Sequence, residues 1–290
     1  MNNFYIIPNN KDILLNNLIL PLEDYSIGFD VYYKVEEINK LSEKYNISVI
    51  INKFMHKTDI ENIGGILNKL INIKYFFIED LGLTYFIPKE KVVISQNHII
   101  NNYDSINYFK ELGFTSVLIN NDLTIEEIKE IISNTSSNLF MYFISKNNLM
   151  YSKRHLISSF SDYKNNVLDN KKEISEKVSN YKLLIKEEEC GTCIFNSKIF
   201  SANKYLDDIA CINKIINLSN INEEKTKVIL NNYNNKDLDK LLEVDNYFLE
   251  NKIAYKVGDL NDWDIKPSRW LRKTQMGFNL WSRCCLYRRL

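Results

Sequence analysis

The residues best suited to chemistry lie in one short segment, Tyr151-Ser152-Lys153-Arg154-His155, which closely follows an apolar run ending at Ile144. A buried strand that ends and is followed at once by such groups is typical of one wall of an α/β active site. Arg154 is the only arginine before Arg269, and a guanidinium can bind an anionic group through paired hydrogen bonds. We therefore predict that Arg154 binds an anion and that His155 transfers protons or binds a metal ion. A capped turn with a structural arginine is the alternative.

Other polar residues follow the ends of several predicted strands. In a barrel of parallel strands these positions line one mouth, so the residues that follow each strand converge there. Glu79 is the candidate general base, whereas Asn52, Gln96, Asn101 and Tyr151 are the candidates for substrate binding. Each of these residues has a structural alternative, because strand ends are polar in any protein. Together they predict a small polar ligand at this mouth.

These groups need a scaffold that brings strand ends together, and the hydrophobic pattern predicts one. Strand-like runs alternate with helical spacing, which is typical of βα units and a parallel sheet. The expected strands are 4–8, 26–33, 47–51, 75–78, 91–95, 116–119, 139–144 and 208–218. The expected helices are 35–45, 59–71, 104–112, 124–132, 223–233 and 238–251, with 11–18 as a short helix or turn. We predict a TIM-like (β/α)8 barrel, regular or distorted, with an insertion after the seventh strand; a doubly wound open sheet is the runner-up.

The domain organisation is predicted from a change in composition. Residues 1–257 form the barrel domain, including a hairpin insertion at 160–204 that turns at 190–192. Residues 258–290 are rich in arginine and tryptophan and form an appended or poorly packed tail. A nucleic-acid or membrane-surface binding role is the alternative for this tail.

The composition excludes several classes of protein. Thirty-seven basic side chains balance thirty-seven acidic ones, so no overall field attracts nucleic acid or an anionic membrane, and nucleic acid is expected only as a substrate. Five cysteines, an odd number, fit a reducing cytoplasm better than a disulfide scaffold. No long apolar run or basic leader occurs, which predicts a cytoplasmic protein without a membrane span.

The segment Leu149-Met-Tyr-Ser-x-Arg154-x-Leu156 resembles the signature of the collagenase-like peptidase family, the unassigned peptidase family thirty-two. Further similar segments, among them Ser26-Ile-Gly-Phe-Asp30 and Ile78-Glu-Asp-Leu-Gly-Leu83, extend the resemblance over residues 4–257. This chain has Ser145, Asn148 and His155 where the family has glycine, proline and cysteine. The resemblance implies a barrel-like fold.

What the resemblance implies about function leaves alternatives open. Some relatives hydroxylate RNA bases or quinones with an iron–sulfur cluster, but His155 replaces a ligand cysteine, so we do not expect that cluster here. A zinc site of His155, Cys190 and Cys193 is a weaker alternative. The leading hypothesis is a barrel enzyme for a small polar or anionic substrate, and the reaction that the resemblance implies is hydroxylation of an RNA base or a quinone, as in relatives. The others are a non-catalytic subunit partnered with a cluster-containing homologue, and a peptidase.

Overall fold

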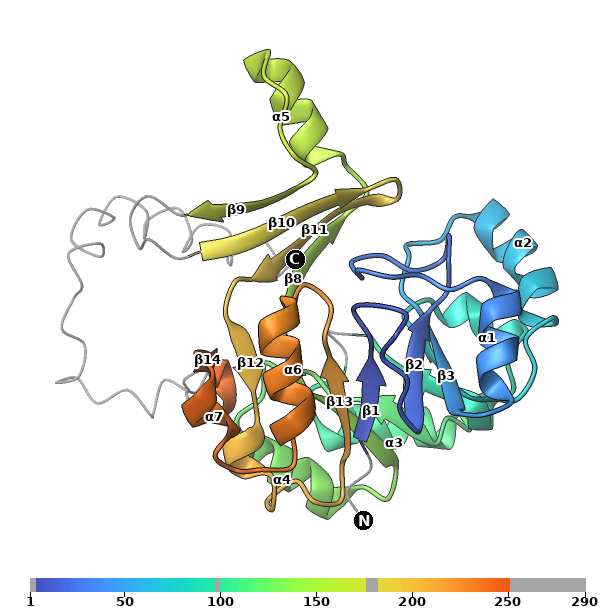
Figure 1. Cartoon of the computed structure of the whole chain (residues 1–290). Coiled ribbons are helices and arrows are strands. Elements are labelled where there is room, and N and C mark those ends of the chain that lie inside the picture. Colours follow the sequence, from blue (N-terminus) through green and yellow to red (C-terminus); the bar gives the residue numbers. More distant parts are fainter. Residues whose placement is uncertain (1–3, 97–99, 176–181, 251–290) are drawn as a thin grey trace, which may run out of the picture. The chain divides into compact units, whose positions relative to one another are not determined.

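The computed structural model describes residues 4–96, 100–175 and 182–250, and its centre is a closed barrel of parallel strands (Figure 1). The barrel strands run in the order β1, β2, β3, β4, β5, β6, β7 and β13, and β13 pairs with both β7 and β1. Their bounds are Phe4–Ile7, Asn17–Pro21, Asn46–Ile51, Ile73–Ile78, Val92–Ile94, Ser116–Leu118, Asn138–Ser145 and Asn213–Asn217. The predicted (β/α)8 barrel is confirmed.

The barrel interior is filled by side chains that all eight strands contribute. One buried cluster takes at least one residue from each of the eight strands, and the ring of Phe140 lies at its centre. The Phe140 ring makes edge contacts with Tyr5 and Phe77, with centroids 5.3 and 5.1 Å apart. Since aromatic rings fill the barrel below its mouth, a ligand can enter only at an end.

Helices follow most of the strands and cover the outside of the barrel. They are α1 Val35–Ser42, α2 Lys57–Leu67, α3 Tyr103–Glu111, α4 Ile125–Asn134, α6 Glu223–Asn232 and α7 Leu238–Leu241. Thr124 and Glu127 form the predicted capping box at the start of α4. Short 3₁₀ turns, η1 Leu81–Tyr85, η2 Lys89–Lys91, η3 Asn203–Tyr205 and η4 Tyr247–Leu249, complete the connections. None of the described helices combines the length and apolar character needed to cross a bilayer.

The predictions for three segments were wrong. Residues 26–33 are not the second strand: β2 lies at Asn17–Pro21 and begins within the segment 11–18, which was predicted as a helix or turn. The pattern at 26–33 reflects burial of a loop, because Ile27 and Phe29 are 1% and 4% exposed without being in a strand. Residues 238–251 do not form one long helix, since α7 is followed by β14 Val244–Asp245 and η4.

A second sheet follows β7. Its four antiparallel strands run in the order β8 Asn148–Ser152, β11 Gly191–Asn196, β10 Lys182–Glu188 and β9 Lys171–Ser175, with α5 Leu156–Lys164 between β8 and β9 (Figure 1). The predicted hairpin turn forms between β10 and β11, where Glu188 pairs with Gly191. The chain returns through β12 Ile199–Ser201, which is antiparallel to β7 and also pairs with β14. The tail predicted at 258–290 lies outside the described residues.

Candidate functional site

A cavity of about 730 Å³ lies at the carboxyl ends of the barrel strands. Its lining comes mainly from the residues that follow β3, β4, β5, β6 and β7 and from the last residue of β13. Residues of β8, β11 and the loop at 27–29 also contribute. The floor is apolar, with Ile50, Leu118 and Tyr142, and the wall is rich in amides. This is the place where a barrel collects ligand-binding groups.

Four of the residues predicted from sequence line this cavity: Asn52, Glu79, Gln96 and Tyr151. The other three, Asn101, Arg154 and His155, are not part of its lining. Asn101 is exposed and accepts a hydrogen bond from the side chain of Asn120, which does line the cavity. The predicted set is therefore divided between the cavity and its surroundings.

Glu79 is the cavity residue with the most unusual electrostatics. It follows β4, and burial raises the pKa of its carboxyl group from 4.5 to about 8. Within the described residues its carboxylate takes part in no hydrogen bond or ion pair. Its backbone carbonyl accepts from the side-chain amide of Gln96 at 2.7 Å, and its backbone N–H donates to the carbonyl of Ile51 at 3.3 Å. Burial and, to a smaller extent, the negative charge of Glu79 raise the pKa of Tyr142. A carboxyl group that changes charge near neutral pH inside a cavity is suited to proton transfer.

Several oxygen atoms in the cavity wall lack a partner among the described residues. They are Oγ of Ser95, Oε1 of Gln96 and Oδ1 of Asn121, and all three are buried. Asn121 donates its own amide hydrogen to Asn147 at 3.0 Å, so its oxygen remains as an acceptor. Buried polar atoms normally have partners. Each of these atoms could accept a hydrogen bond from a donor that came within reach at this wall.

Asn52 and Tyr151 hold the cavity wall in place. The Asn52 side chain bonds both backbone groups of Ile27, accepting from its N–H at 2.9 Å and donating to its carbonyl at 3.1 Å. Tyr151 donates to the carbonyl of Cys190 at 3.1 Å and stacks on Phe54, with centroids 4.2 Å apart. The side-chain amide of Asn52 is thus already hydrogen-bonded within the chain. The Phe54 side chain, in contrast, is 47% exposed.

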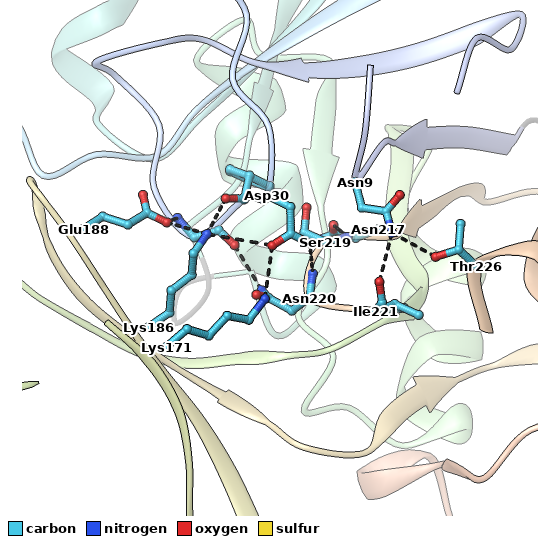
Figure 2. Close-up of polar contacts among 12 residues, drawn as sticks. Asn9, Asp30, Lys171, Lys186, Glu188, Asn217, Ser219, Asn220, Ile221 and Thr226 are labelled. Carbon is cyan, nitrogen blue, oxygen red and sulfur yellow. Dashed lines mark hydrogen bonds and ion pairs between the residues drawn. The ribbon is translucent and has the colours of Figure 1, made fainter. Parts of the chain in front are cut away.

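A cluster of charges fastens the second sheet to the barrel loop at 28–30 (Figure 2). Lys186, whose side chain is 14% exposed, lies 2.7 Å from Glu188 and 3.9 Å from Asp30, and donates to the carbonyl of Phe29. Lys171 lies 3.2 Å from Asp30. Because the sheet supplies part of the cavity wall, this cluster also keeps the cavity closed on that side.

Arg154 and His155 belong to the turn between β8 and α5. Arg154 is exposed, and its carbonyl accepts a hydrogen bond from the hydroxyl of Thr192 at 2.7 Å. Nδ1 of the half-exposed His155 lies 3.8 Å from Glu187, whose carboxylate accepts from the backbone of Ile157 at 2.6 Å in the first turn of α5. The contacts of these residues in the structure are those of a capped turn.

Sequence reasoning did not single out Lys146, which directly follows β7 and lines the cavity. The one available signal was its position after a predicted strand. Its residue type did not distinguish it, because lysine is the chain's usual basic residue.

The described cysteines and histidines do not form a metal site. No group of three or more His, Cys, Asp or Glu side chains in the described ranges is placed to hold a metal ion. Cys193 is fully buried, which raises the pKa of its thiol to about 12, and Cys190 is half-buried on the hairpin turn. The donors for a zinc ion or an iron–sulfur cluster are therefore not assembled in this part of the chain.

A closed (β/α)8 barrel with a polar cavity at its carboxyl end and an antiparallel sheet after the seventh barrel strand defines the class of this protein. The chain belongs to peptidase family U32, whose sequence pattern matches residues 31–244.

Two solved structures are similar to this chain at low identity. The U32 peptidase Mk0906 is 10% identical, with 76% of this chain and 93% of that chain covered and a TM-score of 0.45. The chitinase ChiW from Paenibacillus sp. str. FPU-7 is 11% identical, with 84% of this chain and 29% of that chain covered and a TM-score of 0.21. No curated protein matches this chain.

Proposed function

We propose that the cavity binds a small, flat ligand that carries N–H or O–H donors, and that Glu79 accepts a proton from it. The raised pKa of Glu79, in a cavity where the described residues leave its carboxylate unpaired, carries this proposal. A base with a pKa near the working pH is ionised in part, and its ionised form accepts a proton readily.

The unpartnered atoms of the wall support a donor-rich ligand. Gln96 and Asn121 offer amide oxygens, which can only accept hydrogen bonds. Phe54 offers a partly exposed aromatic ring at the same wall. A nucleobase has both N–H donors and a flat face, whereas the carbonyl oxygens of a quinone would meet other acceptors. Of the substrates implied by the family resemblance, an RNA base therefore suits the cavity better.

Two other reactions have less support. Peptide hydrolysis would need a hydroxyl or thiol beside an imidazole, and neither His56 nor His155, the histidines in the described ranges, lines the cavity. Hydroxylation needs a redox group, and the described residues assemble no donor set for a metal cluster. The proposal is therefore confined to ligand binding and proton transfer, and no oxidation step is included.

The test compares uracil with its doubly N-methylated form, which keeps the ring and both carbonyls but has no N–H donor. We expect calorimetry to detect uracil binding, with affinity that rises between pH 6.5 and pH 9 as Glu79 ionises, and at least about tenfold weaker binding of the methylated form. In Glu79→Gln the affinity should be independent of pH.

The replacement of another amide controls for general effects on the cavity. Asn68→Ser alters an exposed amide at the end of α2, outside the cavity lining, and it should leave uracil binding unchanged. Equal binding of the two ligands would refute the donor requirement. An unchanged pH dependence in Glu79→Gln would refute the role of Glu79 and leave a binding protein, as expected of a non-catalytic subunit.

A further inference from the structure

A basic corner of the cavity, where β7 and β13 end, plays no part in the proposed proton transfer. Lys146 directly follows β7 and Asn217 is the last residue of β13, and both line the cavity. The half-buried Lys146 ammonium forms no hydrogen bond or ion pair with any of the described residues. Ser219 lies two residues after Asn217, and its buried Oγ has no hydrogen-bond partner among the described residues. An unpaired ammonium in a partly enclosed site favours an anion.

The charged groups around Lys146 leave a surplus of positive charge. Burial is the larger cause of its lowered pKa, and the ammonium groups of Lys171 and Lys225 contribute next. Two carboxylates, Asp30 and Glu173, act in the opposite direction. Both have other partners: Asp30 is 3.2 Å from Lys171 (Figure 2), and Glu173 is 2.8 Å from Lys182.

After these pairings, Lys146 and Lys225 remain without a carboxylate partner. Lys225 is not part of the cavity lining, but its charge is among the causes that lower the pKa of Lys146. Lys225, in the first turn of α6, makes no ion pair within the described residues, so Lys146 and Lys225 are both available. Two cations match the charge of a phosphate monoester, which is close to −2 near neutral pH.

The side of the cavity opposite Lys146 is acidic. Glu79, Asp80 and Asp122 line the β4 to β6 side. The cation on that wall, Lys53, is already engaged with Asp59 at 3.1 Å. An anionic group therefore favours the Lys146 corner, and the donor-bearing part of the ligand favours the acidic side.

We propose that Lys146 and Lys225 bind a phosphate group of the ligand, so that the substrate is a nucleotide unit and not a free base. The loops after the seventh and eighth strands are a frequent place for phosphate binding in barrels of this kind. This inference deepens the proposed function and rests on it for the position of the base. It also assigns the anion to a cation different from Arg154.

The test titrates inorganic phosphate into the full chain at constant ionic strength, followed by phosphorus NMR. We expect saturable binding that Lys146→Met weakens by about tenfold or more, because it removes a charge-assisted hydrogen bond. Lys146→Arg keeps the charge and should bind within a few fold of the unsubstituted chain. Lys225→Met should weaken binding by a smaller factor.

The control is Lys44→Met, which removes an exposed lysine without an ion pair in the described part of the chain, and it should bind phosphate normally. Non-saturable binding, equal weakening in Lys44→Met, or no effect of Lys146→Met would overturn the phosphate site. The two ligands separate the two proposals. Uracil binding without phosphate binding refutes only this inference, and phosphate binding without uracil binding refutes only the proposed base site.

Discussion

Replacing Glu79 by glutamine should stabilise the chain at alkaline pH. The folded chain keeps a proton on Glu79 up to a pKa of about 8, whereas the unfolded chain releases it near 4.5. Between these values the folded state binds more protons, so the free energy of unfolding falls as pH rises and becomes level above pH 8. The glutamine of Glu79→Gln does not ionise, so the free energy of unfolding of this variant should not decrease over this pH range.

The size of the effect follows from the two pKa values. A pKa difference is worth about 1.4 kcal/mol for each unit, so a rise from 4.5 to about 8 corresponds to an upper bound of about 5 kcal/mol. Water in the cavity screens part of this penalty, and about 2 to 4 kcal/mol is the expected gain. At pH 5 the two chains should differ by less than about 1 kcal/mol.

The assay is urea unfolding at pH values from 5 to 9, with the free energy obtained from the midpoint and slope. Glu90→Gln is the matched control, because this glutamate is exposed and has no ion pair within the described residues. Parallel pH profiles of Glu79→Gln and the unsubstituted chain would refute the argument, since Glu79 would then titrate alike in both states.

Three further predictions concern hydrogen bonding and packing within the chain. Asn52→Ala should lower the free energy of unfolding by about 2 to 4 kcal/mol, because it leaves both backbone groups of Ile27 without their partner; amide exchange at Ile27 checks this. Gly191→Ala should cost about 3 kcal/mol or more in urea unfolding, since the new Cβ would lie 2.2 Å from a backbone oxygen at a φ of +134°. Alkylation followed by peptide mass spectrometry should modify exposed Cys211 at least about tenfold faster than buried Cys193, whose thiol pKa is about 12. Comparable rates would show that Cys193 is accessible.

Most of the barrel could be predicted from the sequence because its strands are short, apolar and separated by amphipathic helices. The capping pair Thr124 and Glu127 is a local signal, and it marks the start of α4 correctly. The second strand could not be placed, because hydrophobic periodicity reports burial and not pairing. The loop at 26–33 is buried beneath β11, where Ile27 packs with Cys193 and Phe195, so it carries the apolar pattern of a strand.

The candidate site was predictable only in part for a related reason. Asn52, Glu79 and Gln96 follow strands that end at the mouth, so the rule that polar residues gather there placed them in the cavity. Asn101 lies beyond the strand end and contacts the cavity residue Asn120 instead. Side-chain pairings such as that of Asn52 with the Ile27 backbone involve residues distant in sequence, which spacing does not reveal.

The choice between Arg154 and Lys146 depends on where the chain leaves the barrel. β7 ends at Ser145, and Asn147 receives hydrogen bonds from Ser145 and Asn121 that hold this exit at the mouth. Beyond it, β8 extends for five residues, and at about 3.3 Å for each residue a strand of this length covers about 16 Å. Lys146 therefore stays at the cavity, whereas Arg154 follows the far end of β8. The sequence shows both cations after one apolar run, but only the pairing of β8 with β11 separates them.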